Sequence, residues 1–261
     1  ALPIYFRSND SLDNYLKKNN VVAIAEIDTR RLTRILREKG VQAGCIMTGV
    51  NADRAQAQMI AQAFSNDGVD LVKDVTCQKA YEWTEGTWVL GQGYQQNSEQ
   101  PLHVVVYDFG VKRNFLRLLA DRGCRLTVVP ATTPASEVLA MNPHGVFLSN
   151  GAGDPSACDY GVETIKTLVA HNVPLFGVGL GHQLLGLAAG ARTEKMKHGH
   201  HGTNHPVQNL ATGKVIISSQ NHNFVISDAG FPETLAVTHR SLFDDSIQGI
   251  QLKNQLAFSY Q

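Results

Sequence analysis

A glycine-rich turn has the residue types and spacing of a site for nucleophilic chemistry. Gly177, Gly179 and Gly181 alternate between an apolar stretch at residues 173–176 and a helix-like segment that begins at His182. The pattern predicts a strand, a tight turn and a helix, which lift one residue to the strand tip in front of free N–H groups. Such a turn exposes a nucleophile beside oxyanion donors. The tip residue should be Ser or Cys, and here it is Gly179.

A second glycine-rich loop, NGAGDP at residues 150–155, follows another apolar stretch. It lacks both the GK[ST] ending of a phosphate-binding loop and the spacing of GxGxxG. We therefore expect its backbone N–H groups to act as oxyanion donors or to hold a substrate carboxylate. The alternative for the turn at residues 177–181 is an ordinary strand-to-helix connection without a functional site.

The elements around these loops predict a mostly parallel α/β sheet flanked by helices. Strands alternate with helices from residue 103 onward, and both loops follow strands that should be neighbours. Ligands of such sheets bind at the carboxyl ends of the strands, so the loops predict a pocket there. Strands are expected at 104–107, 126–129, 146–148 and 173–176, followed by antiparallel strands near 215–218, 235–238, 247–251 and 256–260.

A smaller α/β segment precedes this domain. Helices are expected at 12–18 and 54–64, and another is capped by Asp28 or Thr29 and ends at Gly40. Strands are expected at 21–27 and 45–48. The second helix has a basic face, which is either solvated or a contact surface for a larger partner. A polar stretch with both tryptophans, at residues 80–101, predicts a strand near residues 87–90 and then a linker. The predicted domains are therefore 1–100 and 101–261.

Composition excludes several classes of protein. The 261 residues suffice for one large or two ordinary domains, and 23 basic residues balance 23 acidic ones. Nucleic acid or an anionic membrane is therefore not expected as the main partner. No apolar run approaches the roughly 20 residues of a membrane span, and no signal peptide is evident. Four scattered cysteines favour the reducing cytoplasm. The chain opens with Ala1, which predicts a fragment or a processed product.

Histidines gather at residues 198–205, which suggests a metal site. Their spacing matches no standard zinc pattern, and no cysteine or carboxylate lies within the cluster. We therefore predict a glycine-rich surface loop, shaped for packing or substrate closure, and no metal.

Six motifs are spread along the chain: IDTRRLTR at 27–34, YDFGVKRN at 107–114, SNGAGDP at 149–155, GLGHQLL at 179–185, HGHHGTNHPV at 198–207 and SQNHNF at 219–224. Together they resemble the small, glutamine-hydrolysing subunits of carbamoyl-phosphate synthase, which are class I triad glutamine amidotransferases, and the resemblance covers nearly the whole chain. It implies hydrolysis of L-glutamine through a cysteine thioester, with ammonia passed to a large ATP-dependent subunit that makes carbamoyl phosphate for arginine and pyrimidine synthesis. It implies no cofactor on this chain, since ATP and Mg belong to the large subunit.

The resemblance also implies roles for individual residues. Leu180 supplies an oxyanion N–H, and Gln183 is a side-chain contact to glutamine. Asn223 stands where the family usually has glycine, so its side chain either crowds the pocket or needs a positive φ, which Asn tolerates best. The remaining glutamine-binding residues are Gly151 and Gly153 of the earlier loop, and Asn221 and Phe224 of a later substrate loop.

Three departures from the family predict a catalytically impaired subunit. Gly179 replaces the cysteine, and the sequence ends at Gln261, where the family continues into a Gly-His-Pro-Glu run with the catalytic histidine and its acidic partner. The family's N-terminal domain, which adds a serine to glutamine binding, is absent before Ala1. His182 and His222 have no evident acidic partner and are not expected to replace the base. The alternative is a non-catalytic subunit that binds glutamine or docks on the large subunit.

Overall fold

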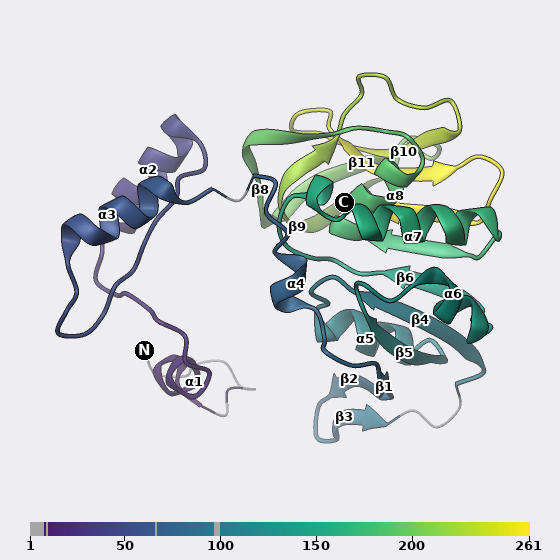
Figure 1. Cartoon of the computed structure of the whole chain (residues 1–261), viewed down its shortest axis with the longest axis horizontal. Coiled ribbons are helices and arrows are strands. Elements are labelled where there is room, and N and C mark those ends of the chain that lie inside the picture. The colour runs from purple at the N-terminus through teal and green to yellow at the C-terminus, as the bar shows by residue number, and fades with distance from the viewer. Residues whose placement is uncertain (1–7, 9, 66, 97–99) are drawn as a thin grey trace. The chain divides into compact units, whose positions relative to one another are not determined.

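The structure, a computed structural model, describes residue 8 and residues 10–65, 67–96 and 100–261. The chain divides into two compact units, Ala1–Ser65 and Asn66–Gln261, whose elements are labelled in Figure 1. The domain boundary expected near residue 100 falls inside the second unit and stays a prediction about the family's domains. No helix within the described ranges is long and apolar enough to cross a membrane.

The first unit contains the helices expected from the sequence. The side chains of Ser11, Asp28 and Asp53 each accept a hydrogen bond from a backbone N–H three residues later, which satisfies a donor that the helix leaves free. The basic side chains of the second helix are exposed. The helices are α1 (Leu12–Lys18), α2 (Thr29–Lys39) and α3 (Arg54–Ala63).

The strands predicted at residues 21–27 and 45–48 are wrong. Neither segment pairs with a strand in the part of the first unit that the structure describes. Val21, Val22 and Ile24 are more than half exposed, at 51%, 53% and 57%. Apolar β-branched residues favour extended backbone, but a strand forms only where a neighbour accepts and donates its backbone hydrogen bonds.

A ten-stranded mixed sheet forms the centre of the second unit. Its middle strands, β5, β4, β6, β7 and β12, run parallel, and antiparallel strands continue on both sides. The predicted α/β fold class is confirmed. In sheet order the strands are β1 (Tyr81–Trp83), β5 (Cys124–Pro130), β4 (Leu102–Asp108), β6 (Gly145–Leu148), β7 (Leu175–Val178), β12 (Ala257–Tyr260), β11 (Ile247–Leu252), β10 (Leu235–Ser241), β8 (Thr193–Asn209) and β9 (Val215–Ile226).

Helices cover both faces of the parallel strands (Figure 1). Along β4 the side chains alternate: Val105 packs in the same cluster as Leu168 of α7 and Leu184 of α8, whereas Val106 packs on the other face with Leu116 of α5. Burial on both faces explains why these strands are apolar throughout. The helices of this unit are α4 (Val72–Val75), α5 (Arg113–Ala120), α6 (Ala135–Ala140), α7 (Asp159–Ala170) and α8 (Leu180–Ala188), with a 3-10 turn at Pro155–Ala157.

Two parts of the second unit depart from the sequence expectations. The strand expected near residues 87–90 is β2 (Glu85–Val89), which pairs with β3 (Gly93–Gln96) in a separate two-stranded sheet. The surface loop predicted at residues 197–206 is wrong, because these residues belong to the long strand β8. Pairing with β9 supplies their backbone hydrogen bonds, and register shifts along the pair accommodate residues that do not fit a regular ladder.

Candidate functional site

The predicted strand–turn–helix is present and has the backbone of a nucleophile elbow. Gly179 lies between β7 and α8 with φ 56° and ψ −113°, a conformation that is strained for residues with a side chain. Its N–H donates to the carbonyl of Tyr260 at 2.9 Å, which ties the elbow to the end of β12. A Cβ at Gly181 would lie 2.2 Å from the Leu148 carbonyl oxygen, so glycine is needed there for the helix to approach β6.

The first turn of α8 presents a free backbone donor. The Gly181 N–H donates to the Ser149 carbonyl at 3.0 Å, and the Gln183 N–H donates to the Gly179 carbonyl at 3.1 Å. The Leu180 N–H, at the helix start, has no acceptor among the residues that the structure describes. Helix N-termini attract negative charge, so this group suits an oxyanion.

The loop that follows β6 lies beside the elbow, because β6 and β7 are neighbouring parallel strands as predicted. Asn150 fixes the loop: its Nδ2 donates to the Gly110 carbonyl at 2.8 Å, and its Oδ1 accepts from the Lys112 N–H at 3.1 Å. A Cβ at Gly151 would lie 2.4 Å from the carbonyl oxygen of Phe109, so glycine is required at this position.

Asp154 anchors the other end of the loop. Its carboxylate accepts hydrogen bonds from the Gly68 N–H at 3.0 Å and from the N–H and hydroxyl of Ser156 at 2.9 and 2.7 Å. Burial raises the pKa of Asp154, but these hydrogen bonds outweigh burial and leave the pKa below its usual value. The carboxylate therefore stays charged at neutral pH and keeps the loop in place.

A cavity of about 370 Å³, here called the elbow cavity, opens in front of Gly179. Every glutamine-site residue predicted from the sequence lines it, although their roles in binding stay predictions. The predicted residues are Gly151, Gly153, Gly179, Leu180, Gln183, Asn221, Asn223 and Phe224. The cavity is also lined by residues for which the sequence predicted no contact to glutamine: Leu71, Lys112, Phe115, Ser219, Gln220, His222 and Gln261.

Gln183 connects the elbow helix to the opposite wall. Its Nε2 donates to the Phe224 carbonyl at 2.8 Å and to Oε1 of Gln261 at 2.9 Å, and its side chain is buried. Gln261 follows β12, whose carboxyl end lies beside the elbow. This placement explains how a residue at the end of the sequence reaches the cavity.

The wall opposite the elbow is a strand and not the loop that the resemblance implied. Asn221, Asn223 and Phe224 all belong to β9. For Asn223 the expectation was either a positive φ or a side chain in the pocket. Its φ is not positive, and its side chain lines the pocket. His201 of β8 holds both amides, with Nδ1 2.7 Å from Asn221 Oδ1 and Nε2 3.0 Å from Asn223 Oδ1.

Two histidines lie near the elbow, of which His182 is buried and His222 is half-buried. His182 of α8 has Nδ1 2.9 Å from the Ser259 hydroxyl, while its Nε2 has no partner in the described part of the chain. Burial lowers the pKa of His182 to about 3. Burial, together with the nearby His200, lowers the pKa of His222 to about 4. Both rings are therefore neutral at neutral pH, and neither contacts a carboxylate among the residues that the structure describes.

The structure shows no metal-binding arrangement in the ranges it describes, where three or more His, Cys, Asp or Glu residues that could hold an ion do not come together. One carboxylate does meet the histidine cluster, since Asp244 lies 2.9 Å from His200. The elbow cavity is thus lined by main-chain donors and amide side chains.

Comparisons with known proteins show the family of the chain. The family model "Glutamine amidotransferase class-I" matches residues 105–261, and "Carbamoyl-phosphate synthase small chain, CPSase domain" matches residues 2–46. The carbamoyl phosphate synthase small chain of Pasteurella multocida is 59% identical over 98% of this chain and 66% of its own length. The small chain of Acinetobacter baylyi is 59% identical over 98% of this chain and 68% of its own. The chain thus spans about two thirds of the length of these relatives.

Two solved structures share the fold at low sequence identity. A glutamine amidotransferase from Methylobacillus flagellatus is 20% identical, with a TM-score of 0.51 over 63% of this chain and 70% of that one. A glutamine amidotransferase from Thermotoga maritima is 15% identical, with a TM-score of 0.50 over 61% and 74%. The fold and the matched model define a class I glutamine amidotransferase domain. The chain belongs to the carbamoyl phosphate synthase small chain family.

Proposed function

We propose that the elbow cavity binds L-glutamine, and that Gly179 leaves it without the thiol that attacks the glutamine amide in this family. The observation that carries the proposal is the elbow itself. Gly179 occupies the nucleophile position with elbow geometry, beside a free Leu180 N–H and in a cavity of about 370 Å³. A glycine has no side chain that could form a thioester.

The cavity retains groups that recognise glutamine. The Leu180 N–H and the loop at Gly151 are placed for the side-chain amide oxygen of the ligand. Asn221 and Gln183 add amide groups. Asn223 narrows the space, because its side chain lines the cavity where the family usually has glycine. We therefore expect weak binding, with a Kd in the range of about 1 mM, or about −4 kcal/mol.

The family assignment extends the proposal to a partner. The relatives are named as small chains of carbamoyl phosphate synthase, so this chain would dock on a large synthetase subunit in the cytoplasm. ATP and Mg would bind to that large partner. The exposed basic residues of α2, Arg30, Arg31, Arg34, Arg37 and Lys39, are candidates for such a contact.

Titration calorimetry tests the binding proposal. L-glutamine should bind the purified chain with millimolar affinity, and D-glutamine, the matched control, should bind at least tenfold more weakly, because the site's groups are placed for one stereoisomer. A micromolar Kd for L-glutamine, or equal heats for the two stereoisomers, would contradict the proposed site.

A further inference from the structure

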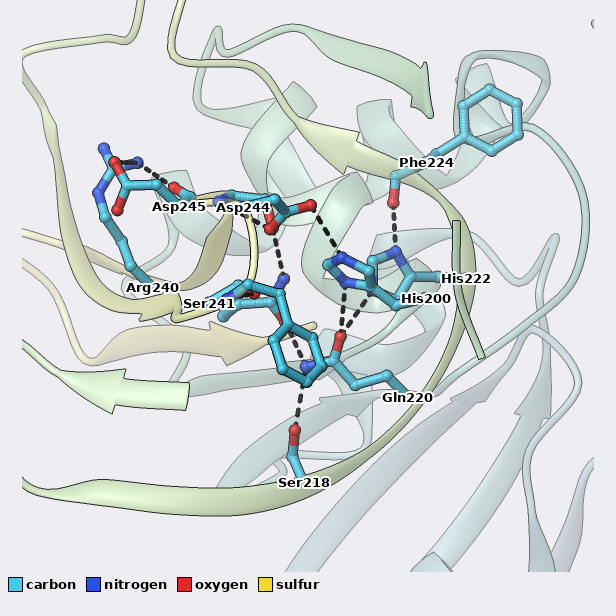
Figure 2. Close-up of polar contacts among 12 residues, drawn as sticks. His200, Ser218, Gln220, His222, Phe224, Arg240, Ser241, Asp244 and Asp245 are labelled. Carbon is cyan, nitrogen blue, oxygen red and sulfur yellow. Dashed lines mark hydrogen bonds and ion pairs between the residues drawn. The ribbon is translucent and has the colours of Figure 1, made fainter. Parts of the chain in front are cut away.

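The two walls of the elbow cavity depend on separate polar networks. On the β9 side, His222 and Gln220 lie next to His200, which contacts Asp244 at 2.9 Å (Figure 2). None of these four side chains hydrogen-bonds to the glycine loop at residues 150–153 within the ranges that the structure describes. That loop is therefore fixed by other groups.

Asp108, at the carboxyl end of β4, is 6% exposed and accepts three main-chain hydrogen bonds. Its Oδ1 accepts from the N–H groups of Gly110 at 2.9 Å and Val111 at 2.8 Å. Its Oδ2 accepts from the Cys77 N–H at 2.9 Å, which belongs to a segment 31 residues earlier in the chain. Both carboxylate oxygens are thus bonded, one to the turn that follows β4 and one to the earlier segment.

The turn after Asp108 lies against the glycine loop. A Cβ at Gly151 would lie 2.4 Å from the Phe109 carbonyl oxygen, and a Cβ at Gly110 would lie 3.5 Å from the Gly151 Cα. The side chain of Asn150 bonds to the same turn through both of its amide atoms, at 2.8 and 3.1 Å. Because the turn and the loop are in such close contact, a shift of the turn would displace the N–H groups of the loop, which are candidates for ligand binding.

The earlier segment, residues 68–77, contributes to the cavity wall. Leu71 lines the cavity, and its Cβ would lie 3.2 Å from a Cβ at Gly153. Asp154 accepts a hydrogen bond from the N–H at the start of this segment, at 3.0 Å, and Asp108 accepts from the N–H at its end. Two carboxylates thus hold the segment at both ends, and Asp108 also holds the turn against the loop.

We propose that Asp108 is a positioning residue of the elbow cavity, which holds the turn against Gly151 and the segment that carries Leu71. Asp108 is not among the described residues that line the cavity, so it acts through the main chain and not on the ligand. Asp108→Ala removes all three hydrogen bonds. Asp108→Asn has nearly the same size but only one oxygen, which can keep the two bonds to the turn. Its NH₂ group would then face the Cys77 N–H and could not accept from it.

Amide hydrogen exchange of the full chain, followed residue by residue with NMR, tests the positioning. The Lys112 N–H bonds to Asn150 and not to Asp108, so it reports whether the turn still holds the loop. In Asp108→Ala this amide should exchange at least tenfold faster relative to the Val106 amide in the middle of β4, which corrects for a loss of global stability. In Asp108→Asn the Cys77 amide should exchange at least tenfold faster and the Lys112 amide should not, and this variant decides where the first does not fold.

Asp121→Ala is the matched control. Asp121 also accepts a main-chain hydrogen bond from a distant segment, from the Thr87 N–H at 3.1 Å, and it is not among the described residues that line the cavity. The Thr87 amide should therefore exchange faster in this variant, whereas the Lys112 amide should not change.

Glutamine affinity provides the second readout, and this arm rests on the proposed function. The Kd for L-glutamine should rise about tenfold in Asp108→Ala, about threefold in Asp108→Asn, and not at all in Asp121→Ala. Unchanged amide exchange at Lys112 in Asp108→Ala and at Cys77 in Asp108→Asn overturns the proposal. Faster exchange with an unchanged Kd overturns it as well, because Asp108 would then be only structural. If the parent chain binds no glutamine, the proposed function fails, while the exchange data still decide whether Asp108 holds the loop.

Discussion

The two walls of the elbow cavity are built from different parts of the chain. At the elbow, the main chain provides the Leu180 N–H and the glycine backbone at 151 and 179. On β9, side chains provide the surface, with Asn221 and Asn223 held by His201. A main-chain wall keeps its donors whatever side chain stands at position 179, so the elbow backbone is in place with a glycine there. A side-chain wall changes with each substitution.

The largest effect on glutamine binding is expected from a side chain added to the glycine loop of the elbow wall. Gly151→Ala would place a Cβ 2.4 Å from the Phe109 carbonyl oxygen, so the loop must move. We expect loss of measurable glutamine binding and a fall of about 2–3 kcal/mol in the free energy of unfolding, measured with urea. Gly145→Ala is the control, because its Cβ would meet the Pro174 carbonyl at an ordinary 3.4 Å. Equal losses in both variants would contradict the special role of the loop.

Restoring a thiol tests whether the elbow still activates one. A Cβ at position 179 meets nothing closer than Asn150 Cβ at 3.5 Å, so Gly179→Cys fits, although the positive φ costs about 1–3 kcal/mol. The new thiol would lie at a helix N-terminus, which favours thiolate. We expect iodoacetamide to alkylate it about a hundredfold faster than Cys158, because burial raises the pKa of Cys158 to about 12.

Turnover should not return with the thiol alone, because glutamine hydrolysis also needs a proton donor and a base. A Gly-His-Pro-Glu extension after Gln261 would start at the end of β12, beside the elbow. The extension and Gly179→Cys together should therefore release ammonia far faster than either change alone. Gly179→Ala, with the same backbone strain and no thiol, is the control. Equal turnover with and without the extension would show that a residue within 1–261 is the base.

The lowered pKa values of His182 and His222 predict that the folded chain loses stability in acid. The ordinary pKa of histidine is 6.5, and the pKa values of His182 and His222 in the folded chain are about 3 and about 4. Below pH 6.5 the unfolded chain binds protons that the folded chain does not, so stability falls as the pH decreases toward 4. Each ring contributes up to about 1.4 kcal/mol per pH unit. The lowered pKa of Asp244 acts only below its ordinary 3.8.

Urea unfolding of the second unit between pH 7.5 and 4.5 measures this slope. His182→Gln should reduce the slope, because the variant lacks one of the rings whose pKa is lowered. Ser259→Ala, which removes the Nδ1 partner and keeps the ring, should retain the slope. A slope that His182→Gln leaves unchanged would contradict the assignment.

The smallest effect on glutamine affinity is expected from a substitution in the β9 wall. Asn223→Gly removes a side chain that lines the cavity, and we expect the affinity for L-glutamine to rise by about threefold. Asn223→Ala is the comparison, because it removes the amide that His201 holds and keeps a Cβ in the cavity, so its gain in affinity should be smaller. Titration calorimetry with L-glutamine distinguishes the two variants. Weaker binding of glutamine to Asn223→Gly would mean that Asn223 is a ligand contact and not an obstruction.

The elbow wall of the cavity could be predicted from the sequence, and the strand pairing of the β9 wall could not. The elbow could be predicted from the spacing of Gly177, Gly179 and Gly181, because a local turn does not depend on residues far away in the sequence. The β9 wall depends on register and on residues far apart, such as His200 and Asp244, which are 44 residues apart in the sequence. The failed strand at residues 21–27 has the same cause, because its composition cannot show whether another strand lies beside it.

Ammonia release from L-glutamine by the purified chain tests the central claim most directly. The claim is that the elbow cavity keeps its donors and lacks its nucleophile, and loss of a nucleophile costs roughly 10⁶ in rate in comparable triads. We therefore predict no ammonia above the background of buffer and glutamine. Release at a rate typical of enzymes, abolished by substituting a residue other than Gly179, would contradict the account.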